Sequence, residues 1–257
     1  MRRIEGAPGS GSTPILLLHG FTGSGEGWGE EIPRRLARRG PVWIVDLPGH
    51  GDAAHEVPPF HQVVDDLAHE VGDVQAHWIG YSMGGRIALS VAVRYPEVVA
   101  SLVLESASPG LEDPAARRER RASDEALARS IESEGIEAFV DFWEAHPLFR
   151  SRRRLPQGIV EGERARRLGQ DPAGLAGALR QMGTGVQPSH WGDLEGLDRR
   201  VLLLTGALDE KFVAIADRMA ATLPRAWRRT LSGVGHTVHL EAPDSWLTAV
   251  ESFLDGG

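Results

Sequence analysis

Cysteine is absent from the 257 residues of this chain, and lysine occurs only once, at Lys211. Without cysteine the chain has no disulfide, no thiolate-ligated metal and no cysteine-held cluster. Long apolar stretches are also missing, since none approaches the roughly 20 residues that a membrane-spanning helix requires. The first residues carry two arginines but no apolar run with a cleavage site, so we expect no secretory signal. These absences favour a cytoplasmic protein without a membrane partner.

Positive charge is scarce as well, because 28 Lys and Arg face 36 Asp and Glu, for a formal net charge of −8. This balance argues against nucleic acid or anionic membrane as a partner. Arginines nevertheless cluster as "ARRERR" (116–121), "RSRRR" (150–154) and "ERARR" (163–167). They indicate either a solvated helix surface with ion pairs or a set of cations for a small anionic ligand. Nothing in the sequence requires a second subunit, so we expect a monomer.

Short apolar segments bounded by turn residues alternate with helix-length segments along most of the chain. Such runs are typical of strands buried on both faces of a parallel sheet. The alternation predicts an α/β fold, with a mostly parallel twisted sheet flanked by helices. The expected strands are 15–18, 42–45, 77–79, 101–105, 201–205 and 226–231. The expected helices are 28–39, 60–73, 84–95, 210–222 and 243–254.

The alternation stops between about Gly110 and Gly192, where Ala, Arg and Glu recur at helical spacing without a buried strand. We therefore predict a helical cap at 111–191, inserted after the sixth-strand region and lying over the carboxyl edge of the sheet. Residues 1–110 and 192–257 form the predicted core.

The segment "GYSMGGR" (80–86) lies between an expected strand and an expected helix. A nucleophile elbow has this order, because the serine adopts a strained backbone conformation that the flanking glycines accommodate. The elbow also places Ser82 at a helix N-terminus, where the dipole and free amides stabilise negative charge. Ser82 is therefore the candidate reactive group, and a small residue in a tight turn is the alternative.

A serine hydroxyl needs a base and an acid to react, and behind a nucleophile elbow the acid precedes the histidine in the chain. Asp209 follows an expected strand by a few residues, and His236 lies in a glycine-bearing loop before the last helix, so we prefer His236 to His239. Glu105 is the competing acid. Glu210 is less favoured, because a shift of one residue aims its side chain elsewhere.

Two backbone amides are needed to stabilise an oxyanion. One is predicted at Met83, directly after the serine, and the other at Phe21, in the loop after an early strand. His19 in the same loop is interpreted as a structural residue.

A dinucleotide-binding unit is the competing interpretation of "HGFTGSGEGWG" (19–29), because Asp46 ends the next strand at a suitable distance. The glycines lack the G-x-G-x-x-G spacing, however, and Asp46 leads into "LPGHG". No H-E-x-x-H or similar ligand cluster is present. We therefore expect neither a nicotinamide cofactor nor a metal, and no other cofactor is called for.

With "LHGFTGS", "DLPGHG", "GYSMGGR" and "GVGH" in this order, the sequence resembles the α/β-hydrolase superfamily over nearly its whole length. One branch is closer, because "LESASPGL", "FWEAHPLF", "RQMGTGVQPSHW" and "LDEKF" are similar to the 2-succinyl-6-hydroxy-2,4-cyclohexadiene-1-carboxylate synthases of menaquinone biosynthesis. That resemblance implies a lyase that removes pyruvate from a cyclohexene tricarboxylate. Ser82, assisted by His236 and Asp209, would take a ring proton without forming an acyl-enzyme.

The resemblance also implies a set of cationic and aromatic substrate-binding residues. They are Tyr81, Arg86, Arg120, Trp143 and one arginine of "ERARR", for which Arg167 is favoured while an ungapped alignment selects Arg164. A polyanionic carboxylate substrate fits these residues, because arginine binds carboxylates bidentately and stays charged. A salt bridge for Arg86 and a place in the core of the cap for Trp143 are the alternatives.

Two other functions use the same motifs. A serine hydrolase that cleaves an anionic ester, or a carbon–carbon bond of a diketone, would need every one of the three reactive residues. A binding protein without activity would need none of them, so their joint presence argues against it.

Overall fold

A twisted sheet forms the centre of the molecule in the computed structural model, which describes residues 1–7, 9, 12–53 and 56–256. In this part of the chain the sheet has seven strands in the order β1-β3-β2-β4-β5-β6-β7. β1 pairs antiparallel with β3, and every other neighbouring pair is parallel. The strands are β1 (Arg2–Ile4), β2 (Ile15–Leu18), β3 (Val42–Val45), β4 (Ala76–Tyr81), β5 (Val99–Glu105), β6 (Arg200–Gly206) and β7 (Ala226–Leu231). The predicted fold class is confirmed.

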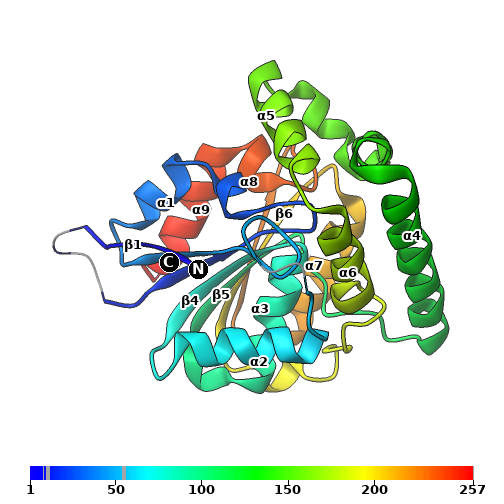
Figure 1. The fold of residues 1–257 in the computed structure, drawn as a ribbon. Helices are drawn as coiled ribbons and strands as arrows, with labels where there is room; N and C mark the ends of the chain where they lie inside the picture. Colours follow the sequence, from blue (N-terminus) through cyan, green and yellow to red (C-terminus); the bar gives the residue numbers. More distant parts are fainter. Residues whose placement is uncertain (8, 10–11, 54–55, 257) are drawn as a thin grey trace.

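Helices cover both faces of this sheet (Figure 1). On one face lie α2 (Phe60–Val71), α3 (Met83–Arg94) and α7 (Glu210–Thr222). On the other lie α1 (Glu31–Leu36) and α9 (Pro243–Leu254), with the short α8 (Val238–Glu241) before α9. The remaining short turns of the core are η1 (Gly25–Trp28), η2 (Pro96–Val98) and η4 (Leu194–Gly196).

The alternation of side chains along β2 shows why the apolar runs form central strands. Leu16 and Leu18 pack into the core on the side of α2 and α3, whereas Ile15 and Leu17 pack on the side of α1 and α9. All four are at most 1% exposed. Because successive side chains of a strand point to opposite faces, only an uninterrupted apolar run fills both cores.

A helical cap lies beside the sheet and connects β5 to β6 (Figure 1). It consists of α4 (Pro114–Ala145), η3 (Pro147–Arg154), α5 (Gln157–Leu168) and α6 (Pro172–Met182). α4 starts at Asp113, whose carboxylate accepts hydrogen bonds from two backbone amides of the first turn, and bends at Gly135, where φ is +86°. Phe139, Leu175 and Leu179 belong to an apolar core of the cap's own.

The point of insertion differs from the prediction, since the cap follows the fifth strand of the chain and not the sixth. Four parallel strands and the antiparallel edge strand β1 are all that precede it.

Two short elements were not predicted, and one helix is shorter than predicted. β1 has three residues and is largely exposed, so it lacks the apolar run that marks the central strands. α8 has only four residues. Within the expected helix 28–39, Gly29 at φ +64° separates η1 from α1. No helix among the described residues combines the length and apolarity needed to cross a bilayer.

Candidate active site

Ser82 stands in the sharp turn between β4 and α3 with φ +50° and ψ −106°, a conformation that side chains rarely adopt. Gly80 and Gly84 permit this turn because of close backbone contacts. A Cβ at Gly80 would overlap the backbone of Gly84, and one at Gly84 would overlap the carbonyl of Leu18. The backbone amide of Ser82 donates to the carbonyl of Glu105 at 2.8 Å, which ties the turn to β5. The strained turn places the hydroxyl at the carboxyl edge of the sheet.

His236 and Asp209 meet Ser82 at this edge. His236 Nε2 lies 3.2 Å from Ser82 Oγ, and His236 Nδ1 lies 2.6 Å from Asp209 Oδ2. The imidazole and the carboxylate are both buried. The loops that carry them approach closely, and the contact requires glycine at position 206, because a Cβ there would overlap the backbone of Gly235. The structure thus brings together the three residues that the sequence singled out, in the geometry of a hydroxyl, a base and an orienting acid.

The competing acids lie elsewhere. The carboxylate of Glu105 is fully buried and accepts hydrogen bonds from His239 Nδ1 at 2.8 Å and from the indole of Trp246 at 2.8 Å. Glu210 begins α7 on the exposed surface. Among the described residues, neither glutamate has a hydrogen bond to His236.

The amides of Phe21 and Met83 are available for an oxyanion. Neither N–H donates a hydrogen bond to any described residue, and both belong to segments that meet beside Ser82. The amide of Gly84 donates to the carbonyl of His19 at 3.1 Å, which holds the loop after β2 against the start of α3. Unpaired amides at a helix N-terminus stabilise developing negative charge.

His19 has the structural position that was expected of it. Its Nδ1 donates to the carbonyl of Gly20 at 2.8 Å, and its Nε2 accepts from the amide of Leu47 at 3.0 Å. Burial lowers the pKa of His19 to about 4, so its ring is neutral near pH 7. The neutral ring with one donor and one acceptor fixes the shape of the loop that carries Phe21.

Tyr81 lies directly before Ser82 and contacts the imidazole of His236, with 5.4 Å between the ring centroids. Its hydroxyl is 3.0 Å from Thr237 Oγ1, which also accepts from Arg152 Nε at 2.9 Å. Burial raises the pKa of Tyr81 to about 12, so the phenol remains protonated. Neither Thr237 nor Arg152 was predicted as a site residue, because "RSRRR" offers no signal that distinguishes one arginine from its neighbours.

Arg86 is buried one turn after Ser82 and donates to the carbonyl of Met182 at 2.9 Å and to Gln187 Oε1 at 3.2 Å. Burial lowers its pKa to about 10, with a further contribution from nearby Arg120, so the guanidinium stays charged. Arg120 pairs with Asp124 at 2.8 Å, and its side chain is 42% exposed. These two cations form one group, in which Arg86 comes from α3 and Arg120 from α4, beside the end of α6.

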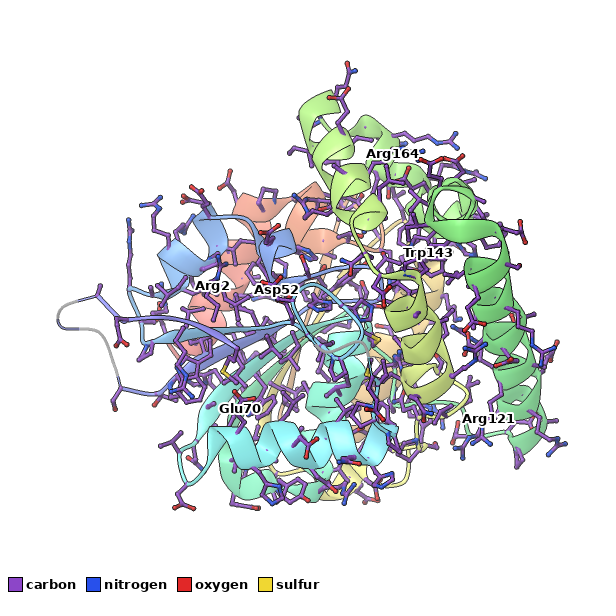
Figure 2. The ribbon with its side chains drawn as sticks, in the orientation of Figure 1. Arg2, Asp52, Glu70, Arg121, Trp143 and Arg164 are labelled. Carbon is purple, nitrogen blue, oxygen red and sulfur yellow. The ribbon has the colours of Figure 1, made fainter. Side chains whose placement is uncertain are left out.

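The arginines of "ERARR" are neutralised within the cap. Arg167 is only 4% exposed and donates to Glu144 and Glu163, each at 2.9 Å. Arg164 donates to Glu144 at 2.9 Å and to Asp141 at 2.6 Å, at the top of the cap in Figure 2. Arg167 is the deeper of the two and lines the cleft beside Phe21, whereas Arg164 does not.

Trp143 belongs to an aromatic cluster between the cap and the sheet (Figure 2). Its ring centroid is 5.3 Å from that of Phe21 and 5.4 Å from that of Phe149, which in turn lies 6.1 Å from His236. Its indole N–H is buried without a hydrogen-bond partner among the described residues. Such a donor is costly unless a ligand accepts from it.

No group of three His, Cys, Asp or Glu side chains in the described part of the chain is arranged to hold an ion. The contacts among Ser82, His236 and Asp209 offer the chemistry of a serine hydroxyl. The hydroxyl can be deprotonated by His236, next to two free amides and below a cap that carries cations.

The chain is similar to known proteins over most of its length. Residues 15–249 match the alpha/beta hydrolase family. A Bacillus subtilis protein, provisionally named as a 2-succinyl-6-hydroxy-2,4-cyclohexadiene-1-carboxylate synthase, is 42% identical over 254 residues, which are 95% of this chain and 90% of that one. The Klebsiella pneumoniae synthase of the same name is 31% identical over 247 residues, 93% of each chain. MenH from S. aureus has a TM-score of 0.94 at 35% identity, with 99% of this chain and 97% of that chain covered. The chain therefore belongs to the alpha/beta hydrolase family.

Proposed function

We propose that this protein is a lyase that eliminates pyruvate from 2-succinyl-5-enolpyruvyl-6-hydroxy-3-cyclohexene-1-carboxylate in menaquinone biosynthesis. The product is 2-succinyl-6-hydroxy-2,4-cyclohexadiene-1-carboxylate. The observation that carries the proposal is the likeness to S. aureus MenH, which covers 99% of the chain and so includes the cap as well as the core. Ser82, His236 and Asp209 are compatible with several reactions. Likeness in the cap bears on the substrate, because in this proposal the cap contributes residues that bind it.

Ser82 acts as a base in this proposal, with His236 and Asp209 as its positioning partners. The hydrogen on C2 of the substrate ring lies next to the succinyl ketone, so its removal gives an enolate. Ser82 Oγ takes this proton after passing its own to His236 Nε2, 3.2 Å away. Asp209 Oδ2, at 2.6 Å from His236 Nδ1, stabilises the imidazolium. The amides of Phe21 and Met83 stabilise the enolate oxygen.

The electrons released from C2 then expel the leaving group. They form the C2–C3 double bond, the C3–C4 double bond moves to C4–C5, and the bond from C5 to oxygen breaks. The oxygen leaves with the electron pair as the enolate of pyruvate, which takes on carbon the proton held by His236. The atoms balance without water, a covalent enzyme intermediate or a cofactor, and the product is the 2,4-diene.

Carboxylates of the substrate require cations, and Arg86 and Arg120 supply them in this proposal. Arg86 is held by Met182 and Gln187 one turn beyond Ser82, so its position is fixed before substrate arrives. Arg120 pairs with the buried Asp124 of the same helix, and its charge acts on Arg86. A guanidinium fixed in advance loses little conformational entropy on binding a carboxylate. Tyr81, Trp143 and Arg167 complete the proposed substrate-binding set.

Serine hydrolysis of an anionic ester is the second candidate. The strained Ser82 and the two free amides suit a tetrahedral acyl intermediate as well as an enolate. Burst kinetics with an activated ester would favour it.

The experiment generates the substrate in place from isochorismate and 2-oxoglutarate with the upstream synthase. Wild type and Ser82→Ala are then compared for pyruvate release and for the absorbance of the diene. We expect both signals to rise with wild type and to stay at the spontaneous rate with Ser82→Ala. A wild type that adds nothing to the spontaneous rate contradicts the proposal.

A further inference from the structure

Arg152 is a cation of the cap that has no carboxylate partner. It lies in η3, half-buried, and its Nε and Nη2 donate to Thr237 Oγ1 at 2.9 and 2.5 Å. Its guanidinium also stacks on the ring of Phe149 at 4.4 Å. Among the described residues, no carboxylate lies within ion-pair distance of it. A hydroxyl and an aromatic face orient this charge, which interacts with the carboxylate of Glu163 without forming an ion pair.

Arg167 provides the contrast within the same cap. Each of its terminal nitrogens donates to a glutamate, Nη1 to Glu144 and Nη2 to Glu163. Glu144 also pairs with Arg164 and Glu163 with Arg166, so Arg167 belongs to a shared network, and binding a further anion would require breaking an existing pair. Of the two arginines, Arg152 is the one with charge left for a ligand.

The position of Arg152 places this charge beside the reactive histidine. Thr237, which it contacts, is the residue after His236, and Phe149, on which it stacks, lies 6.1 Å from the His236 ring. Arg152 lines the cleft that contains Phe21 and Tyr81. It also lines a cavity of about 290 Å³ between the cap and Leu240 of α8, called the cap cavity below. Arg152 thus lies between the loop that carries Phe21 and the cap cavity.

That cavity suits a small anion. Its charged lining consists of three arginines and two glutamates, so its formal charge is positive by one. Its volume far exceeds the roughly 15 Å³ that one water molecule needs on the same measure. Besides these charged groups it is lined by Ala145, Phe149, Leu155, Val160 and Leu240.

We propose that Arg152 binds the carboxylate of the departing pyruvate unit and that pyruvate leaves through the cap cavity behind it. This inference rests on the proposed function. The leaving group takes its proton from His236, so its carboxylate belongs on the side of the site where His236, Thr237 and Arg152 meet. Arg86 and Arg120 form a separate group near Asp124, and they are left for the other carboxylates.

The test measures pyruvate binding directly, by calorimetric titration and by saturation-transfer NMR, without turnover. Arg152→Gln is compared with wild type, with Arg120→Gln and with Arg154→Gln. Arg154 is the matched control, because it is an exposed arginine of the same η3 that lines neither space. We expect Arg152→Gln to weaken pyruvate binding at least about tenfold, as loss of a charged hydrogen bond implies, and Arg154→Gln to leave it unchanged. Arg120→Gln should change it less than Arg152→Gln.

Arg152→Lys separates charge from packing, since it keeps the cation but loses the guanidinium plane. Binding restored in part by Arg152→Lys supports the inference. Equal losses in Arg152→Lys and Arg152→Gln, or a larger loss in Arg120→Gln, would overturn it. Release of pyruvate from the full substrate by wild type is measured separately. If that release fails while pyruvate binding still depends on Arg152, the proposed function is wrong but the anion site stands.

Discussion

Glu105 and His239 form a second carboxylate–imidazole pair next to the first, with His239 Nδ1 2.8 and 3.0 Å from the two oxygens of Glu105. The ring of Tyr81 lies between the pairs, at 5.4 Å from His236 and 4.9 Å from His239. Among the described residues, the pair of His236 and Asp209 contacts Ser82, whereas that of His239 and Glu105 does not. We therefore propose separate tasks for the two pairs, one in the chemistry and one in the framework.

Glu105→Ala and Asp209→Asn test this division. Glu105→Ala leaves the buried donors of His239 and Trp246 without an acceptor, so we expect it to lower the free energy of unfolding by about 3–5 kcal/mol. Asp209→Asn keeps the shape of the side chain but no longer stabilises the imidazolium. We expect it to lower kcat by about 10⁴ and to change stability by less than about 1 kcal/mol. Urea unfolding and pyruvate release measure the two effects, and the reverse pattern would assign the pairs the other way round.

Ser82→Gly tests whether a side chain at position 82 strains the backbone of the turn. At φ +50° a side chain costs about 1–2 kcal/mol, and glycine removes that cost. We expect Ser82→Gly to be more stable than Ser82→Ala by about 1 kcal/mol, while both lack activity. The comparison between the two variants controls for loss of the hydroxyl. Equal stabilities would show that the turn is relaxed.

The core of the fold and the sharp turn at Ser82 could be predicted from the sequence because local constraints specify both. The strands β2 and β6 must be apolar on two faces, and the turn at Ser82 needs glycine on each side. A pattern of this kind survives in any sequence that forms the structure. The edge strand β1 has no such pattern, because its three residues bury little.

The pairing of the arginines could not be predicted, because it depends on contacts distant in the sequence. Arg167 meets Glu144 from 23 positions away, and Arg152 meets Thr237 from 85 positions away. Between Leu111 and Gln170 the sequence contains 12 arginines and 12 acidic residues, so composition does not show which of them pair. Which arginine forms an ion pair and which does not depends on the packing of α5 against α4 and of η3 against the loop at Thr237.

The free energy of unfolding should decrease at low pH because the imidazoles of His19 and His50 are buried. Burial, with a contribution from neighbouring His19, lowers the pKa of His50 to about 3, whereas an unfolded imidazole titrates near 6.5. Below pH 6.5 the unfolded chain therefore binds a proton that folded His50 does not, and stability falls with pH until about pH 3. We expect His50→Gln to reduce the slope of unfolding free energy between pH 6 and pH 4.5 by about 1.4 kcal/mol per pH unit. The same substitution at an exposed imidazole, His61→Gln, is measured beside it as the control for losing a histidine. An unchanged slope in His50→Gln would mean that His50 is charged in the folded protein.

Arg120 and Arg164 should differ sharply in their effect on the substrate, although both are cap arginines paired with acids. Arg120 has one carboxylate partner, Asp124, and its charge lowers the pKa of Arg86 next to the reactive serine. Arg164 has two partners, Glu144 and Asp141, at the top of the cap in Figure 2.

We expect Arg120→Gln to raise KM about tenfold or more with a smaller change in kcat, because it removes a charged hydrogen bond made in both the ground and transition states. Arg164→Gln should leave both constants within about twofold, since the surface ion pairs that it breaks contribute at most about 1 kcal/mol to stability. Steady-state rates of pyruvate release measure both variants, and their thermal unfolding shows whether the cap is intact. A larger KM effect from Arg164→Gln would mean that the cap closes onto substrate in a different arrangement, with α5 turned toward the serine.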